Sequence, residues 1–482
     1  MAVAYDLLII GGGINGCAIA REAALNGLEV LLVERDDLAA HTSSASSKLI
    51  HGGLRYLELY DFKLVAEALA ERERLVKAAP HIIHPMRFVL PHTGLRPWWL
   101  IRLGLLLYDL LGGRMTLPRS RGLRKGDLAY RAPLKASSGF VYSDAYVDDA
   151  RLTVFNAMDA AANGAEIAVG VALERAERTD AGWTATLSDG RTVTARALVN
   201  AAGPWVAEAL ARTGVNAAAH VRLVKGSHIV VPRLYEGDHA YILQQPDRRI
   251  VFALSYEGQT AIGTTDVAVE RPEEARIDAD EIAYLCAAAN RHFVPQIAPA
   301  DVTSTWSGVR PLYDDGAGDA RSVTRDYVLE LDEAGPPLLS VFGGKITTAR
   351  HLAEEAVANL GPLLGIAPHP LTRARAFPGG LIGDFDAYVA KVRVTWPFLG
   401  EARSARMAHA YGSLLPELLD GITDEAALGP DLGGGITAVE ARWMKTREWA
   451  RDPDDALDRR SKVGLHLSPE QRSAFAQAWD AL

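Results

Sequence analysis

The sequence predicts an α/β fold in which a parallel sheet is interleaved with an antiparallel sheet and is followed by an all-α domain. Three observations lead to this prediction. A strand, a glycine-rich turn, a helix and a second strand open the chain between residues 6 and 33. Apolar strands that end in small residues return near residues 200 and 342, and alternating strand-like stretches lie between them. Beyond about residue 385 the pattern is charged and helical, so no further strand is expected.

Each element follows from its local sequence. Residues 6–10 form a short apolar run typical of a buried parallel strand, and the helix expected at 14–26 has small residues where it would pack on a sheet. The second strand is expected at 28–33. Later strands are expected at 196–200, 228–231, 249–254, 260–264 and 337–342, with a helix from about 347 to 360.

Composition and charge restrict the class of protein. The 51 basic and 60 acidic residues give a net charge of −9, which is too acidic for a nucleic-acid-binding protein. Cys17 and Cys286 are too few for a disulfide scaffold or a metal cluster, and they fit a reducing compartment. No signal peptide is expected, and the longest apolar run, 97–111, is broken by Arg102 and Asp109. A cytoplasmic protein without a bilayer-spanning segment is therefore expected.

A dinucleotide-binding motif follows the first strand. Gly11, Gly13 and Gly16 match the pattern G-x-G-x-x-G, whose glycines allow a tight turn, approach of a pyrophosphate and close helix packing. The amino terminus of the following helix offers amide groups and a partial positive charge to the phosphates. Glu34 closes the second strand, where its carboxylate can accept hydrogen bonds from ribose hydroxyls. A purely structural turn is the alternative, but the register of all these elements favours a dinucleotide bound in a Rossmann-type domain.

The layout favours FAD over NAD. The motif occurs once, near the start of the chain, and later apolar strands end in Ala201-Ala202-Gly203 and Gly343-Gly344-Lys345. This layout resembles the flavoprotein family that includes D-amino-acid and sarcosine oxidases, in which later strands close around the flavin. The resemblance implies an FAD-binding domain (1–75, 150–220 and 325–385), an interleaved antiparallel-sheet domain facing substrate and membrane (76–149 and 221–324), and a C-terminal helical cap domain (386–482).

A Ser/Thr-rich stretch at residues 41–57 narrows the expectation. It offers hydroxyl and amide groups to phosphates and contains a glycine pair flanked by His51 and Arg55, although a solvated loop is the simpler interpretation of its composition. The stretch resembles the FAD-dependent, aerobic and quinone-linked glycerol-3-phosphate dehydrogenases. Further motifs match that family in the same order, at 225–232, 262–266, 307–312, 324–327 and 342–348, and residues 460–465 resemble its cap domain.

The resemblance implies that the chain oxidises sn-glycerol 3-phosphate to dihydroxyacetone phosphate, with hydride transfer to non-covalent FAD and electrons passed to a membrane quinone. No metal is expected. Cofactor contacts are expected from Gly11, Gly13, Ile14, Asn15, Gly16, Glu34, Arg35, Thr42, Ser43, Ser44, Ser46, Ser47, Leu49, His51, Gly52, Gly53, Val171, Ala202, Gly203, Trp205, Gly344, Lys345, Thr347 and Thr348. Three alternatives stay open: an oxidase that uses O2, an amine or amino-acid oxidase, and a flavin-binding sensor module docked on a membrane.

Removal of the hydroxyl proton needs a base, and histidine suits this step near neutral pH. His51 is the first candidate and His228 the second, with Arg310 as electrostatic support. A phosphate ester carries close to two negative charges, so its pocket is expected to hold several cations. The matched motifs assign substrate binding to Arg55, Tyr56, His228, Arg310, Arg325 and Lys345. Arg325 could equally pair with Asp326 or Glu330 at the surface.

A basic, tryptophan-bearing segment at residues 94–131 fits the headgroup region of an anionic membrane. Against Asp109 and Asp127 it carries eight basic residues, Arg96, Arg102, Arg114, Arg119, Arg121, Arg124, Lys125 and Arg131, interleaved with Trp98, Trp99, Tyr108 and several leucines. Peripheral attachment to the inner face of the cell membrane is expected, as in relatives that respire on quinone. An ordinary packed helix followed by a solvated basic loop is the alternative. A homodimer is possible.

Overall fold

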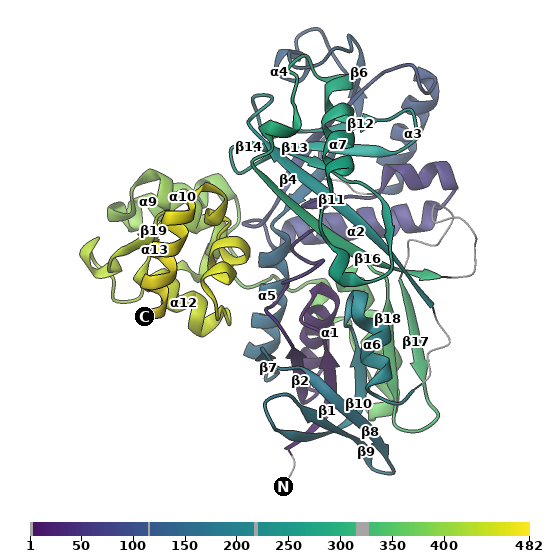
Figure 1. Cartoon of the computed structure of the whole chain (residues 1–482), viewed down its shortest axis with the longest axis vertical. Coiled ribbons are helices and arrows are strands. Elements are labelled where there is room, and N and C mark those ends of the chain that lie inside the picture. The colour runs from purple at the N-terminus through teal and green to yellow at the C-terminus, as the bar shows by residue number, and fades with distance from the viewer. Residues whose placement is uncertain (1–2, 114–115, 216–219, 315–326) are drawn as a thin grey trace.

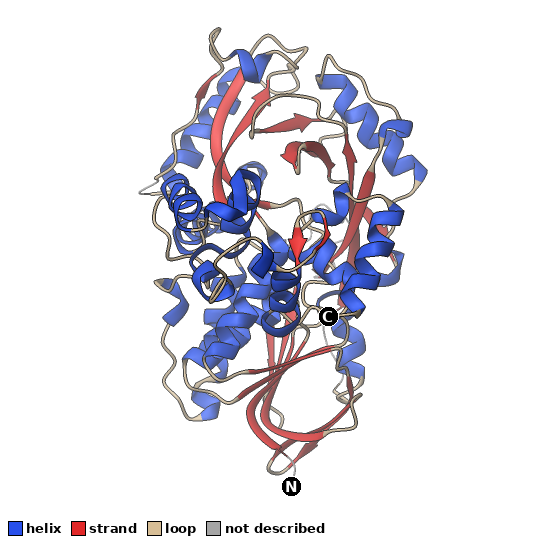
Figure 2. Ribbon diagram, turned by 90° about the vertical axis from the view of Figure 1, so that its left-hand side faces the viewer, coloured by secondary structure: helices blue, strands red, loops and turns tan. Residues whose placement is uncertain are grey.

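The computed structural model describes residues 3–113, 116–215, 220–314 and 327–482. Three bodies are visible in Figure 1: a lower body that holds the amino terminus, an upper body, and a helical lobe at the carboxyl end, on the left. In Figure 2 this lobe lies in front of the junction between the other two bodies. Within the described ranges, no helix combines the length and apolar character needed to cross a membrane.

A mostly parallel sheet forms the lower body. Its strands, in the order in which they lie, are β17 (Val328–Asp332), β18 (Leu338–Phe342), β10 (Thr192–Asn200), β1 (Val3–Ile10), β2 (Val30–Glu34) and β7 (Glu166–Val169). All neighbours from β18 to β7 are parallel, whereas β17 is antiparallel to β18. The hairpin of β8 (Leu173–Thr179) and β9 (Gly182–Leu187) pairs with β10. Every residue of β2 is buried, as expected for a strand covered on both faces.

Helices cover both faces of this sheet. One face packs against α1 (Ile14–Leu25), α5 (Asp149–Ala162) and α8 (Ala349–Leu360), and the other against α6 (Val206–Ala211) and the β8–β9 hairpin. The small residues on α1 are buried, which lets this helix lie close to the sheet. The glycine turn between β1 and α1 therefore sits at the carboxyl edge of the sheet, where ligands bind in open α/β folds.

An antiparallel sheet forms the upper body. Its strands follow the order β15 (Val267–Val269), β11 (His220–Val231), β14 (Gln259–Gly263), β13 (Ile250–Tyr256), β12 (Ala240–Gln244), β4 (Ile83–Pro91), β6 (Gly139–Val147) and β3 (Leu49–Ile50). The long strand β16 (Ser304–Asp314) pairs along β11, and β5 (Arg121–Gly122) pairs with β6. The exception to the antiparallel pattern is the parallel pair of β12 and β4. Helices α2 (Phe62–Ala78) and α3 (Trp98–Leu111) pack on one face and α7 (Ala279–His292) on the other, and α4 (Leu128–Arg131) is a single turn.

The interleaved parallel and antiparallel sheets confirm the predicted fold class. Boundaries shift by a few residues: the second strand begins at Val30 rather than at residue 28, and α8 begins at Ala349 rather than near residue 347. Gly27, with φ of 82°, ends the preceding turn, so the chain becomes extended only after Glu29.

The C-terminal lobe has its own core, formed mainly by α9 (Phe385–Thr395), α10 (Gly400–Tyr411), α11 (Leu415–Leu418), α12 (Ala438–Arg447) and α13 (Pro469–Asp480). The expectation that strands end before this region is wrong in one place. A short hairpin pairs β19 (Asp431–Gly433) with β20 (Ile436–Thr437). Gly433, Gly434 and Gly435 all have positive φ and allow the tight reversal, and strands this short have no detectable hydrophobic period.

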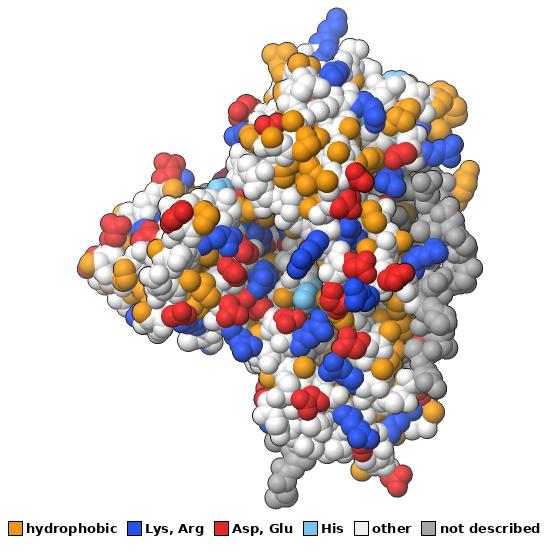
Figure 3. Space-filling model, in the orientation of Figure 1, with side chains coloured by type: hydrophobic (Ala, Val, Ile, Leu, Met, Phe, Trp, Pro, Cys, Tyr) orange, Lys and Arg blue, Asp and Glu red, His pale blue; other side chains and the backbone are white. Residues whose placement is uncertain are grey.

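Charged side chains gather where the lobe meets the body, and Figure 3 shows acidic and basic groups crowded along this junction. Buried ion pairs cross it. Arg151 on α5 lies 2.6 Å from Glu448, and Lys462 lies 2.7 Å from Asp148, which caps α5. The junction is therefore held by charge pairs as well as by apolar contacts.

Candidate functional site

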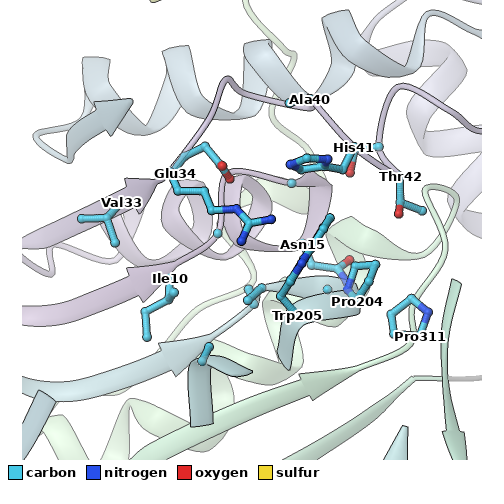
Figure 4. Close-up of a pocket in the computed structure, with 18 of the residues that line it drawn as sticks. Ile10, Asn15, Val33, Glu34, Ala40, His41, Thr42, Pro204, Trp205 and Pro311 are labelled. Carbon is cyan, nitrogen blue, oxygen red and sulfur yellow. The ribbon is translucent and has the colours of Figure 1, made fainter. Parts of the chain in front are cut away.

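A pocket opens at the carboxyl edge of the parallel sheet, and its space together with the solvent at its mouth amounts to about 1040 Å³. Its walls come from the ends of β1 and β2, the start of α1, the loop after β2, and segments near residues 171–173, 201–212 and 343–344. Figure 4 shows Glu34, His41 and Thr42 around it, with Pro204 and Pro311 contributed by distant parts of the chain. The cavity is thus assembled by the same topology that the glycine motif predicts.

The glycine motif forms a turn that leaves no room for side chains at Gly11 and Gly16. Gly11 has φ of 111°, and a Cβ atom there would lie 2.5 Å from the carbonyl oxygen of Ala201. A Cβ atom on Gly16 would lie 2.0 Å from the carbonyl oxygen of Gly11. At Gly13 the nearest atom would be Ser43 Oγ at 3.2 Å. This bare backbone at a helix amino terminus is the cradle that a pyrophosphate needs.

Glu34 is held at the end of β2 with its carboxylate toward the cavity. Its two oxygens accept hydrogen bonds from the amides of Gly12, at 2.6 Å, and Asp36, at 2.8 Å. Burial raises the pKa of this carboxyl group, while the two amides oppose the shift. Each oxygen keeps a further lone pair, so the group can still accept a ribose hydroxyl.

A cluster of aromatic and basic side chains borders the cavity. The sequence predicts some of its members and misses others. Arg35 and Trp205 were expected there, and the guanidinium of Arg35 lies 4.3 Å from the Trp205 ring centroid. His41 was missed, although its ring lies 4.5 Å from the same indole. Pro311 was missed as well, because it arrives from the other sheet and carries no local signal of a nucleotide site.

The predicted cofactor residues divide into two groups. Those that line the described cavity are Gly11, Gly13, Ile14, Asn15, Glu34, Arg35, Thr42, Ser43, Val171, Ala202, Gly203, Trp205 and Gly344. The others, which lie outside that lining, are Gly16, Ser44, Ser46, Ser47, Leu49, His51, Gly52, Gly53, Lys345, Thr347 and Thr348. Side chains of this second group have other contacts. For example, Ser46 Oγ donates to Asp149 at 2.7 Å, and Leu49 is buried in the core beneath α2 and α3.

A second cluster of predicted residues surrounds Lys345, just after Gly344. The Lys345 ammonium nitrogen is buried without a hydrogen-bond partner among the described residues, and it lies 4.1 Å from the centroid of the Tyr56 ring. Burial, together with the positive charge of Lys345, lowers the pKa of His51 to about 4. A buried ammonium without an acceptor is costly unless an anion binds beside it. The cluster is therefore suited to an anionic ligand.

His51 belongs to a tight turn. The amide of Gly53 donates to His51 Nδ1 at 3.1 Å, and the amide of His51 donates to Thr347 Oγ1 at 3.4 Å. A ring nitrogen that accepts an amide hydrogen bond cannot carry a hydrogen itself, so the neutral ring has its hydrogen on Nε2. At neutral pH the ring is uncharged.

His228 and Arg310 lie on the paired strands β11 and β16. His228 is buried and stacks on Trp306 with a centroid distance of 4.9 Å, and its Nε2 lies 3.0 Å from Ser47 Oγ. Burial, with the charge of Arg310, lowers its pKa well below the ordinary value. Arg310 forms an ion pair of 2.7 Å with Asp266 and is partly exposed. The substrate-side prediction at Arg325 lies outside the described residues, and Arg55 is described only by its backbone, on the short 3-10 helix η1 (Leu54–Leu59).

Comparison with known proteins gives consistent results. Residues 6–350 match the family model described as FAD dependent oxidoreductase. The chain is 49% identical to a glycerol-3-phosphate dehydrogenase of Pseudomonas aeruginosa, covering 99% of this chain and 95% of the relative. It is 46% identical to a D-erythritol 1-phosphate dehydrogenase of Brucella abortus, covering 98% and 97%. The solved glycerol-3-phosphate dehydrogenase of Bacillus halodurans, complexed with FAD, superposes with a TM-score of 0.76 at 26% identity, over 99% of this chain and 94% of that one.

Proposed function

Because the chain belongs to the FAD-dependent oxidoreductase family, in the group of the glycerol-3-phosphate dehydrogenases, we propose that it oxidises sn-glycerol 3-phosphate to dihydroxyacetone phosphate. FAD is its cofactor. The observation that carries the proposed substrate is the buried ammonium of Lys345, which has no hydrogen-bond partner among the described residues and lies near a neutral histidine. A phosphorylated alcohol supplies a phosphate anion for Lys345 and a hydroxyl proton for the histidine.

The residues present fit FAD. The turn of Gly11 and Gly13 with the amino terminus of α1 would hold the pyrophosphate, and Glu34 would hold the ribose. The thiol of Cys17 is fully buried and donates to the carbonyl oxygen of Gly12, and burial raises its pKa. Such a thiol is unsuited to a covalent link with the flavin. When bound, FAD supplies the acceptor for the hydride that leaves the substrate carbon.

We assign the hydroxyl proton to His51, with His228 as the second candidate. A neutral imidazole can accept a proton, and the low pKa keeps His51 neutral throughout the physiological range. In the described arrangement, however, its Nδ1 is engaged by the amide of Gly53. Proton transfer to His51 therefore requires either release of this amide or the opposite tautomer. His228 is more constrained, because it is buried between Trp306 and Ser47.

The phosphate is proposed to meet Lys345 and Arg310, with Tyr56 beside the lysine. Arg55 and Arg325 complete the proposed set. Arg310 would exchange or share its partner Asp266 when the phosphate arrives, because a guanidinium can bridge two anions through its fork of donors. The D-erythritol 1-phosphate dehydrogenase among the relatives acts, by its name, on another phosphorylated polyol. The length of the polyol that the site accepts is therefore left to experiment.

Electrons are proposed to pass to a membrane quinone while the protein is docked at an anionic membrane surface. The supporting observation is the exposed apolar face of α3, where Trp99, Leu103 and Leu110 are 64%, 55% and 62% exposed. Orange and blue side chains lie side by side on the upper right edge of Figure 3, where Figure 1 places α3. Arg119, Arg124 and Lys125 in the following loop are also exposed. Apolar and basic groups together are typical of binding at a lipid interface.

Two experiments test these proposals. Anaerobic addition of sn-glycerol 3-phosphate to the purified yellow protein should bleach the flavin absorbance, and D-erythritol 1-phosphate serves as the competing substrate. Absence of bleaching by either would favour a sensor role instead. Turnover with a soluble quinone should exceed oxygen consumption, whereas peroxide formation at the same rate would identify an oxidase.

Docking is tested with vesicles that contain anionic lipid. Leu103→Glu combined with Leu110→Glu should release the protein from them while leaving dye-linked turnover intact. Val394→Glu is the matched control, because Val394 is 82% exposed but lies on the C-terminal lobe. Equal retention of both variants would move the docking surface away from α3.

A further inference from the structure

A buried hydrogen-bond relay reaches the His51 turn from α3. The amide of Gly52 donates to the hydroxyl oxygen of Tyr108 at 2.8 Å. Tyr108 is 1% exposed and lies on the inner side of α3, whereas Leu103 and Leu110 of the same helix are exposed. His51, the proposed proton acceptor, is thus followed by Gly52, whose backbone amide is held by the side chain of Tyr108 on α3.

The relay continues into a fixed ion pair. The hydroxyl of Tyr108 lies 2.8 and 2.9 Å from the two carboxylate oxygens of Asp144 on β6. Arg72 on α2 donates to the same carboxylate at 2.7 Å and to the carbonyl oxygen of Ser143 at 2.9 Å. Burial raises the pKa of Tyr108, so the hydroxyl keeps its hydrogen at any physiological pH. That hydrogen points to Asp144, which leaves the oxygen lone pair for the Gly52 amide.

The turn itself has little freedom. A Cβ atom on Gly52 would lie 2.6 Å from a Leu69 methyl carbon and 2.7 Å from the Tyr108 oxygen. Gly53 has φ of 71°, and its amide is the group that donates to His51 Nδ1. Two successive amides are therefore engaged, the first by Tyr108 and the second by the imidazole. Holding the first fixes the second.

We propose that Tyr108 is a positioning residue which, through the amide of Gly52, holds the 51–53 turn and thereby fixes His51 as the tautomer with hydrogen on Nε2. Tyr108 contacts neither substrate nor cofactor in this assignment. Its role in turnover rests on the proposed function, because the tautomer sets the state from which His51 must accept the substrate proton. The tautomer itself can be measured without turnover.

The test compares Tyr108→Phe with Tyr142→Phe in the FAD-loaded enzyme. Tyr142 is the matched control: it is 2% exposed, packs edge to face on Tyr108 with a centroid distance of 5.7 Å, and its hydroxyl takes no part in the relay. With 15N-labelled histidine, the His51 resonances are assigned by their loss in His51→Gln. The wild-type enzyme and Tyr142→Phe should show hydrogen on Nε2 alone. Tyr108→Phe should move both nitrogen shifts toward the average of the two tautomers.

Stopped-flow reduction by sn-glycerol 3-phosphate gives the second measurement. The rate of flavin bleaching should rise severalfold in Tyr108→Phe, because a looser turn releases His51 Nδ1 from the Gly53 amide while the phosphate-binding residues are intact. The substrate concentration at half-maximal rate should change by less than about twofold for the same reason.

Two results would overturn the inference: hydrogen on Nδ1 of His51 in the wild-type enzyme, or wild-type nitrogen shifts in Tyr108→Phe. The first needs no variant, so poor folding of Tyr108→Phe does not remove the test. If sn-glycerol 3-phosphate fails to bleach the wild-type flavin, the proposed function fails instead, and the nitrogen shifts still decide the role of Tyr108.

Discussion

Arg460 holds Asp37 with two parallel hydrogen bonds, from Nη1 to Oδ2 and from Nη2 to Oδ1, each 2.7 Å long. Both side chains are buried, and they join the C-terminal lobe to the loop after β2. Asp37 lies three residues beyond Glu34, so the lobe is anchored directly beside the proposed ribose site. We therefore expect the lobe to support the nucleotide cavity.

Replacing Arg460 by Met should weaken both the fold and cofactor retention. The variant removes both charged hydrogen bonds from Arg460 and leaves Asp37 with Arg459 Nε alone, at 2.7 Å, so we expect a loss of about 2 kcal/mol. We expect a lower midpoint in denaturant unfolding and faster loss of FAD on dilution. Arg447→Met is the control, since Arg447 forms an exposed pair with Glu417 in the same lobe. Equal FAD loss from the two variants would contradict a supporting role for the Arg460 pair.

Gly13→Val should give a folded but colourless protein. The backbone of Gly13 is not in the left-handed region, and a Cβ atom would meet only Ser43 Oγ, at 3.2 Å. The fold should therefore survive, while the added methyl groups occupy the space that the pyrophosphate needs. The measurement is the ratio of flavin to protein absorbance after gel filtration.

Gly104→Ala provides the comparison, because nothing lies within 4 Å of a Cβ atom built there. It should retain the wild-type amount of flavin. A yellow Gly13→Val protein would place the pyrophosphate elsewhere.

The parts of this site that lie close together in the sequence could be predicted from it. The parts that meet only after the chain has folded could not. Gly11, Gly13 and Glu34 fall within one strand–helix–strand unit, so their spacing alone indicates a nucleotide turn. Pro311 reaches the same cavity from a strand of the other sheet, whereas the sequence assigns the motif at 307–312 to the substrate, through Arg310. The contact between Tyr108 and Gly52 is equally long-range, because the antiparallel sheet and α3 must be in place before the two meet.

Acid should destabilise the protein through its buried histidines. Burial lowers the pKa of His81 to about 3 and that of His84 to about 4. The unfolded chain binds these protons more readily than the folded protein does, so the stabilisation is fully present above about pH 6.5 and is lost as the pH falls toward 4. Denaturant unfolding at several pH values between 7.5 and 4.5 measures this decline.

His81→Leu should make that decline shallower, because neither ring nitrogen of buried His81 has a hydrogen-bond partner among the described residues and the variant removes one titrating group. The slope with pH is the informative quantity, since the substitution also alters packing on Phe155. Phe155→Leu, which disturbs the same packing without removing a titrating group, should keep the wild-type slope. An unchanged slope in His81→Leu would show that other groups dominate the acid response.

Arg310→Ala should raise the KM for sn-glycerol 3-phosphate by roughly 30-fold or more, because a lost charge contact with a desolvated phosphate costs about 2 kcal/mol at least. The side chain already pairs with Asp266, at 2.7 Å, and donates to Thr264 Oγ1, at 3.2 Å, so it is held in place before substrate binds. Arg310→Lys keeps the charge but loses the forked donors, and it should fall between wild type and alanine. Arg271→Ala is the control, since Arg271 is 76% exposed and pairs with Glu274 at the surface. A KM unchanged in Arg310→Ala would remove Arg310 from the phosphate site and leave Lys345 as its main described cation.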